Sequence, residues 1–318
     1  MKILLEEADP RNSVAFLPEV IEGDVVDPHA VFGHHAYIPY EFILFNLPYR
    51  KPDGIVWERT NSNARMNITA GEFENPDGTR HRFVPYGKYA RAALLWVCTQ
   101  AKLTGKPTVE LGRSYNEFMR NLGIGYRDAT KARGGQSSRD VDNCLNQLRA
   151  LFAATVAITV NEEYEKGRIH IQDMGYRVAS SSALWFTKRD STNIDSMLPS
   201  TVTLSDELYG SVLEHGTPVD MGAWRSIQTA SKSPMALDVY VWLCHRLHGL
   251  PAPTNPTWAQ LYEQFGSGSD MKEFKRNFRR AIGVAKKHYP EANVHERLNT
   301  KGHSIGLRLL PSKPALSK

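Results

Sequence analysis

Apolar residues recur at helical spacing in several stretches of this chain of 318 residues. The segments 87–104 and 234–248 each show the pattern of a long apolar helix. The second follows Ser233 and starts with a proline, which suits the first position of a helix. Both contain a similar core, ALLWVC at 93–98 and VYVWLC at 239–244. The pattern therefore predicts two related helices in separate halves of the chain.

A second pair of similar segments follows these helices. The first is SYNEFMRNLG at 114–123, and the second is TWAQLYEQFG at 257–266. Each starts with a hydroxyl residue and has Glu or Gln three positions later, which is the pattern of a capping box at a helix start. Each ends in glycine, Gly123 or Gly266, which favours the left-handed conformation that terminates many helices. We therefore expect a second helix in each copy of the repeat.

A third helix and two strands complete each copy. Apolar faces predict helices at 137–152 and 270–288, and Asp270 is a suitable cap for the second. Strand-like runs follow the third helix of each copy, at 155–160, 168–171, 293–298 and 304–309. Three helices followed by a β-hairpin is the order of a winged helix-turn-helix. The predicted fold class is therefore α+β, with tandem winged helix-turn-helix domains at 83–200 and 201–312.

The segments outside the repeat are less regular. The connection at 172–232 should hold a further strand and a helix near 205–214. Residues 41–50 and 55–70 are rich in β-branched and aromatic residues and flank the turn signal Pro52-Asp53-Gly54. We expect them to form a β-hairpin extension over 41–82. We expect residues 1–40 to be an irregular N-terminal arm and residues 313–318 to be a tail.

The charge is distributed unevenly along the chain. Residues 1–84 hold 8 Lys and Arg against 13 Asp and Glu, whereas residues 85–318 hold 31 against 21. A basic body behind an acidic leading segment indicates a polyanionic partner, although an ordinary basic surface is the alternative. No apolar run reaches the length of a membrane span or forms a signal peptide, so we expect a soluble cytoplasmic protein. Buried free thiols are expected at Cys98, Cys144 and Cys244.

The third helix of the second copy has the pattern of a DNA-recognition helix. Its apolar face is opposed by a face rich in Lys and Arg, whose mutual repulsion a polyphosphate would relieve. Arginine can also grip guanine with two hydrogen bonds. A solvated surface is the alternative interpretation. The candidate DNA-binding residues of this copy, including one at the wing turn, are Lys272, Lys275, Arg276, Arg279, Arg280, Lys286, Lys287 and Lys301.

The corresponding helix of the first copy is less charged and offers amides, which pair well with adenine but are common on any wet helix. The loop before it contains two cations among glycines and could follow a phosphate backbone. The candidate DNA-binding residues of this copy are Lys131, Arg133, Arg139, Asn143 and Asn146.

Motifs of catalysis and of metal or cofactor binding are absent from the sequence. There is no P-loop and no Cys-x-x-Cys pair, so we expect neither a nucleotide cofactor nor a structural metal site. His34 and His35 are adjacent and lack the spacing of the paired-histidine metal motif of nicking enzymes. We therefore expect a binding protein and not an enzyme.

Several motifs in the repeat resemble the plasmid-encoded RepA replication initiators. The matching stretches are VPYGKYARAALLWVCTQAKLTG at 84–105, VELGRSYNEFMRNLGI at 109–124, LRALFAATVAI at 148–158 and SPMALDVYVWLCHRL at 233–247, with LPYRKPDG at 47–54 upstream. The resemblance covers about residues 41–310.

The resemblance implies a function. Such proteins bind repeated sites of double-stranded DNA in a plasmid origin, help to open the duplex and recruit host replication initiator and helicase proteins. Many also repress their own promoter, and related initiators dimerise through the first of two winged-helix domains. A transcriptional repressor on the same scaffold is the main alternative, and a DNA-nicking enzyme is a weaker one.

Overall fold

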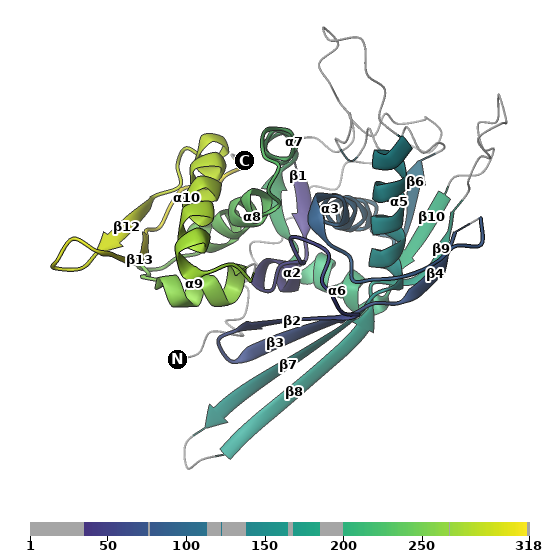
Figure 1. Cartoon of the computed structure of the whole chain (residues 1–318), viewed down its shortest axis with the longest axis horizontal. Coiled ribbons are helices and arrows are strands. Elements are labelled where there is room, and N and C mark those ends of the chain that lie inside the picture. Colours follow the sequence, from purple (N-terminus) through teal and green to yellow (C-terminus); the bar gives the residue numbers. More distant parts are fainter. Residues whose placement is uncertain are drawn as a thin grey trace, which may run out of the picture.

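A computed structural model shows how these segments are arranged (Figure 1). It describes residues 35–75, 77–112, 122, 138–164, 168–184, 200–266 and 268–316. The helices are α2 Tyr40–Leu44, α3 Gly87–Thr104, α5 Ser138–Ala153, α6 Asp206–His215, α7 Met221–Ala230, α8 Met235–His248, α9 Trp258–Phe265 and α10 Met271–His288. The strands are β1 His35–Ile38, β2 Val56–Asn61, β3 Ala64–Thr69, β4 Glu72–Glu74, β5 Arg80–Arg82, β6 Thr108–Gly112, β7 Thr155–Tyr164, β8 Arg168–Arg177, β9 Ala179–Ala183, β10 Ser200–Leu204, β11 Thr217–Asp220, β12 Val294–Leu298 and β13 Ser304–Leu309.

The second copy of the repeat has the expected order of elements. Helices α8, α9 and α10 are followed by the antiparallel hairpin β12–β13. Helix α9 begins with the expected capping box, in which Thr257 and Gln260 each bind the other's backbone N–H. The three helices share an aromatic core, since the ring of Phe265 lies 5.4 Å from that of Trp242 and 5.1 Å from that of Phe278. The second copy therefore forms one small packed unit.

Gly266 differs from expectation. It is not left-handed, because its backbone has φ −58 and ψ 145. The chain instead turns away in an extended conformation directly after the last helical bond, from the Gly266 N–H to the Tyr262 carbonyl (2.7 Å). A Cβ at this position would lie 2.4 Å from that oxygen, so glycine is needed for close approach and not for positive φ.

The first copy is described in part. Its first and third helices, α3 and α5, and its hairpin β7–β8 lie where the pattern placed them, with strands longer than expected. The expected middle helix at 114–123 lies outside the described residues except for Leu122, so the full equivalence of the two copies stays a prediction. The expected helix near 205–214 is α6, and a strand β10 precedes it in a sheet of order β6-β10-β9.

The prediction of a strand at 41–50 is wrong. Residues 40–44 form the short helix α2, which starts after Pro39 and buries Phe42 and Ile43. A short apolar run is compatible with a buried helix or with a strand, so the sequence pattern does not distinguish the two. Here the burial of these residues between other elements determines the helical conformation. The hairpin of this region is instead β2–β3, and β3 also pairs with β7. The β2–β3 hairpin therefore extends the β7–β8 hairpin into a four-stranded sheet of order β2-β3-β7-β8.

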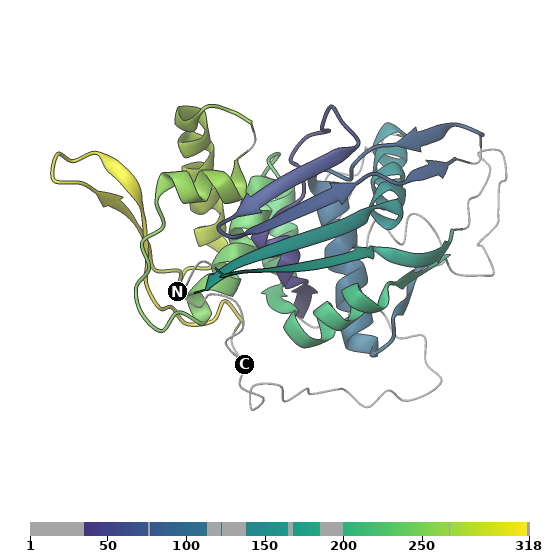
Figure 2. The ribbon, with the colours of Figure 1, turned by 90° about the horizontal axis from the view of Figure 1, so that it is seen from below.

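Two further segments are more regular than expected. Residues 35–38, assigned to the irregular arm, form β1 and pair with β11 at 217–220. Within the extension expected over 41–82, β4 and β5 form a second small hairpin. The partner strand of β1 is distant in the chain, and β4 and β5 have only three residues each. Local periodicity in the sequence therefore reveals neither pairing. Figure 2 shows the four-stranded sheet lying across the molecule, with β12–β13 projecting at one end.

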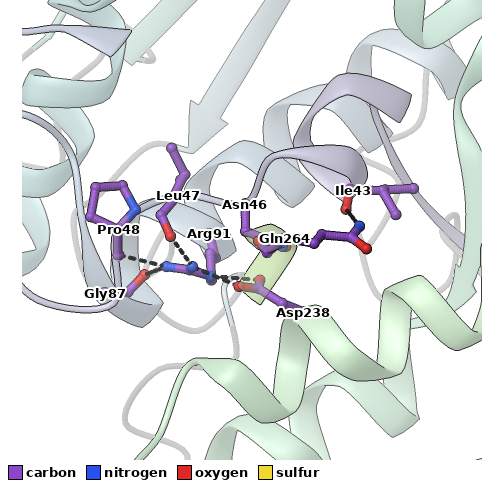
Figure 3. A network of polar contacts seen from close by, with 8 residues as sticks. All are labelled: Ile43, Asn46, Leu47, Pro48, Gly87, Arg91, Asp238 and Gln264. Carbon is purple, nitrogen blue, oxygen red and sulfur yellow. Dashed lines mark hydrogen bonds and ion pairs between the residues drawn. The ribbon is translucent and has the colours of Figure 1, made fainter. Parts of the chain in front are cut away.

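The two copies meet at a buried ion pair. Arg91 of α3 donates to both carboxylate oxygens of Asp238 of α8 at 2.7 Å each (Figure 3). The same guanidinium donates to the carbonyl groups of Leu47, Pro48 and Gly87. One apolar core runs through both copies and across residue 200. Because the apolar core is continuous across residue 200, the predicted division into domains at 83–200 and 201–312 remains a proposal.

Replacing Asp238 by Ala should destabilise the whole chain by about 3–5 kcal/mol, because it leaves the Arg91 charge buried without a counter-ion. The measurement is urea unfolding followed by tryptophan fluorescence. The matched control is Glu74→Ala, which removes a carboxylate from an exposed pair with Arg80 and should cost at most about 1 kcal/mol. Equal unfolding midpoints for Asp238→Ala and the unchanged protein would show that the pair does not hold the junction.

Candidate nucleic-acid interface

Helix α10 is amphipathic and is fixed to the second unit by its apolar face. The Asp270 side chain accepts a hydrogen bond from the Glu273 N–H (2.7 Å), as expected for an N-terminal cap. Phe274, Phe278 and Ala281 are buried, and the helix packs against α8. Seven Lys and Arg residues against one Glu therefore lie on the remaining surface of the helix.

The structure places these seven cations much as the helical periodicity predicted. Five are exposed: Lys272, Arg276, Arg279, Arg280 and Lys287. The flanking Lys275 and Lys286 are partly buried at the edges of the face. The Lys286 ammonium donates a hydrogen bond to the Val294 carbonyl (3.4 Å), so it also connects α10 to β12.

The exposed cations differ in how they are held. Arg276 lies 3.3 Å from Glu273 one turn earlier, in an exposed ion pair that contributes little to stability. Lys272, Arg280 and Lys287 have no ion pair or hydrogen bond with the described residues. Such unpaired cations are available to an external anion.

Arg279 contacts residues of two other elements, β12 and α9. Its Nε lies 3.2 and 3.3 Å from the two carboxylate oxygens of Glu296 on β12. Its guanidinium carbon lies 5.1 Å from the centroid of the Trp258 ring at the start of α9, which is a cation–π contact. The Trp258 indole N–H in turn donates to the Ser304 hydroxyl on β13 (2.8 Å).

These contacts close a ring. A hydrogen bond from Arg279 lowers the pKa of Glu296 against a smaller opposing effect of burial, and a hydrogen bond from Ser304 lowers it further. Arg279, Glu296, Ser304 and Trp258 therefore form a cycle of contacts, which we call the Arg279 ring. It connects α10, both wing strands and α9 at the exposed surface.

The wing tip is also cationic and locally fixed. Lys301 is exposed in the turn between β12 and β13. The Asn299 side chain accepts hydrogen bonds from the Lys301 and His303 N–H groups at 3.0 and 2.9 Å. Gly302 has φ 76, which suits the tight turn that this requires. Lys301 therefore lies in the turn of the β12–β13 hairpin, where the strand pattern placed it, and its role at a wing stays a prediction.

In the first copy, internal contacts occupy part of the expected DNA-reading face of α5. The Asn146 side chain accepts a hydrogen bond from Asn75, at the end of β4 (3.2 Å). Gln147 is buried and accepts from the Tyr86 N–H (2.8 Å). Asn143 remains exposed. The side chains of Lys131, Arg133 and Arg139 lie outside the described part of the structure.

Sequence reasoning missed Glu296, Ser304 and Trp258. Trp258 follows the capping hydroxyl in the repeat, and the other two lie in strands that were expected. Nothing in their local pattern indicates that they meet an arginine of another element. The only available signal was the aromatic residue shared by both copies of the repeat at this position.

Other chemistry finds no support among the described residues. They contain no group of three or more His, Cys, Asp or Glu arranged to hold a metal ion. Cys98, Cys144 and Cys244 are buried thiols outside any disulfide, as expected. None of the helices that the structure describes has the length and apolar character needed to cross a membrane.

Comparison with solved structures finds a similar fold. A crystal structure of domains 2 and 3 of RctB is similar in fold, with a TM-score of 0.50 and 8% identity over 92% of this chain and 100% of that one. A second RctB structure of domains 2–3 gives a TM-score of 0.45 at 8% identity, over 85% of this chain and 95% of that one. No curated protein matches the chain.

The family comparison is decisive because it rests on sequence over a long stretch. The family model described as plasmid encoded RepA protein matches residues 84–263. This range contains α3, α5, α8 and most of α9, so it covers the first copy of the repeat and the start of the second, and α10 and the β12–β13 hairpin lie beyond it. Since it exceeds half of the 318 residues, the protein belongs to the family of plasmid-encoded RepA proteins.

Proposed function

We propose that this protein is a plasmid replication initiator that binds repeated double-stranded sites in the origin, promotes duplex opening and recruits host replication proteins. Membership of the RepA family supports the role in plasmid replication. The observation that carries the DNA-binding part is the exposed cationic face of α10 beside the cationic wing tip at Lys301. The protein acts by binding and not by catalysis.

Both copies are winged helix-turn-helix units in this proposal. Helix α10 enters the major groove and the β12–β13 wing lies along the phosphate backbone, as in other proteins of this architecture. Arg276 and Arg279 lie nearest the middle of the exposed face and contact bases. Lys275 and Lys286 lie at its edges and contact phosphates, which positions the helix without reading sequence.

The second copy supplies more of the affinity than the first. Helix α10 offers three cations without partners among the described residues, whereas two amides of α5 are used in internal hydrogen bonds. Asn143 is the described candidate of α5 that remains exposed and unpaired, and Lys131, Arg133 and Arg139 complete the proposed contacts of this copy.

The protein is a dimer in this proposal, and the first copy provides the interface. Strand β8 is one edge of the four-stranded sheet, and among the described strands it pairs only with β7. It exposes Ile169 and Ile171, whose exposed fractions are 68% and 60%. A long edge strand with exposed apolar side chains readily pairs with another chain. In Figure 1 this ribbon projects away from α10, so a second copy bound there leaves the DNA-binding face open.

The cationic face predicts a specific salt dependence. Replacing Lys272, Arg280 or Lys287 by Ala should lower the slope of log affinity against log salt by about 0.9 for each phosphate that the variant no longer neutralises. The measurement is binding to an origin fragment at several salt concentrations. Lys106→Ala, which removes an exposed cation between α3 and β6, is the matched control and should leave the slope unchanged. If all three α10 variants keep the original slope, α10 is a solvated surface.

The initiator role predicts that replication depends on the gene. A plasmid with this gene and its flanking DNA should yield transformants, and the same plasmid with an early stop codon should yield none unless the protein is supplied in trans. Footprints should cover several direct repeats beside an A·T-rich stretch. Protection of a single palindrome over a promoter, with replication unaffected by the stop codon, would instead indicate a repressor. Metal-dependent relaxation of supercoiled DNA would indicate a nicking enzyme.

The dimer proposal predicts that a charge on β8 separates the subunits. Ile171→Lys should convert a dimer to a monomer in sedimentation equilibrium, because lysine opposes edge-to-edge strand pairing. Leu298→Lys, at an apolar position of the other wing with an exposed fraction of 58%, is the matched control and should leave the dimer intact. Dissociation by Leu298→Lys but not by Ile171→Lys would place the interface on the second copy.

A further inference from the structure

We propose that Glu296, Ser304 and Trp258 position Arg279 so that its free edge reads one guanine in the DNA site, which makes Glu296 a specificity-determining residue of the wing. This inference rests on the proposed function, because it assumes that α10 lies in the major groove. It goes further by assigning sequence discrimination to an acidic residue outside the recognition helix.

The hydrogen-bond donors of Arg279 decide what it can still bind. A guanidinium has five N–H donors in a fixed plane. Glu296 takes the Nε–H and one Nη2–H of Arg279. In the described structure Nη1 has no hydrogen-bond partner. Three N–H donors therefore remain, two on Nη1 and one on Nη2, along the edge of the guanidinium away from Glu296. This Nη1–Nη2 edge matches the two acceptors, O6 and N7, that guanine shows in the major groove.

The stack on Trp258 fixes the plane of that edge. Trp258 is buried in the core, where its ring lies edge-on to those of Phe274 and Phe278 at 6.5 and 6.1 Å, and its N–H is held by Ser304. A guanidinium held between a fixed ring and a carboxylate loses little further freedom when it binds a base. The Arg279 side chain is nevertheless 43% exposed, so the edge remains accessible.

Arg276 provides the contrast on the same helix. It lies beside Glu273 of its own helix, has no ring contact and is 60% exposed. Its side chain therefore has no fixed direction toward the groove. The acidic residue on β12 also has a cost, since a carboxylate beside DNA repels phosphates. Placing Glu296 there weakens general affinity, and the compensating gain is the direction that it gives to Arg279.

The test separates this positioning role from simple repulsion, because the two predict opposite results. The full-length protein is titrated with a duplex carrying one footprinted origin repeat, and with copies in which each G·C pair is changed in turn to A·T. The unchanged protein should discriminate at one pair by about fivefold to over a hundredfold. Glu296→Gln should reduce discrimination at that pair to near onefold, while it binds a shuffled duplex more tightly than before.

Matched variants make the result decisive. Glu291→Gln removes a carboxylate without an ion pair or hydrogen bond among the described residues, and should leave discrimination unchanged. Arg279→Lys keeps the charge but loses the two-pronged edge, so it should lose discrimination at the same pair even if Glu296→Gln fails to fold. In an Arg279→Lys background, Glu296→Gln should have no further effect on that pair.

Two results would overturn the proposal. If Glu296→Gln binds all duplexes more tightly with discrimination intact, Glu296 only repels phosphate. If it loses affinity equally for repeat and shuffled DNA, Glu296 only supports the wing. Failure of the proposed function is distinguishable from both, because the unchanged protein would then not prefer the origin repeat over shuffled DNA.

Discussion

The ion pair between Arg91 and Asp238 determines how the two copies of the repeat are joined. The two side chains are 3% and 8% exposed, and charges at such depth are tolerated only when their hydrogen-bonding groups are satisfied. The guanidinium makes five hydrogen bonds, two to the carboxylate and three to backbone carbonyls of the α2–α3 region. Since this uses all five of its donors, the pair fits one arrangement of α2, α3 and α8.

Other contacts of the same N-terminal segment reinforce this junction. Strand β1 pairs with β11 of the connection, and the Gln264 side chain of α9 donates to the Ile43 carbonyl (3.2 Å; Figure 3). Arg59 of β2 reaches the Glu263 carbonyl of α9. Because α10 packs on α8 and α9, these contacts also fix the direction of the cationic face relative to the four-stranded sheet.

The third helices of the two copies differ in which polar side chains they leave exposed. In the second copy the third helix leaves its cations exposed, and the wing supplies a residue that directs one of them. In the first copy the β2–β3 hairpin extends β7–β8 into a four-stranded sheet, and Asn75 and Tyr86 donate hydrogen bonds to two amide side chains of α5. In the proposed function, the exposed edge of this sheet serves assembly and the cationic face of the second copy contacts DNA.

The sequence by itself determined the main helices of the repeat and the second hairpin, because each of these depends on local periodicity and capping. The helices α3, α5, α8, α9 and α10 lie within a residue or two of the predicted bounds, and the cationic face of α10 follows directly from helical geometry. Its DNA contacts remain a proposal. Only the tertiary structure decided the helical state of 40–44, the pairing of β1 with β11 and of β3 with β7, and the meeting of Arg279 with Glu296 and Trp258. Each of these depends on residues distant in the chain, and a local pattern carries no information about which partner will bury or pair a given side chain.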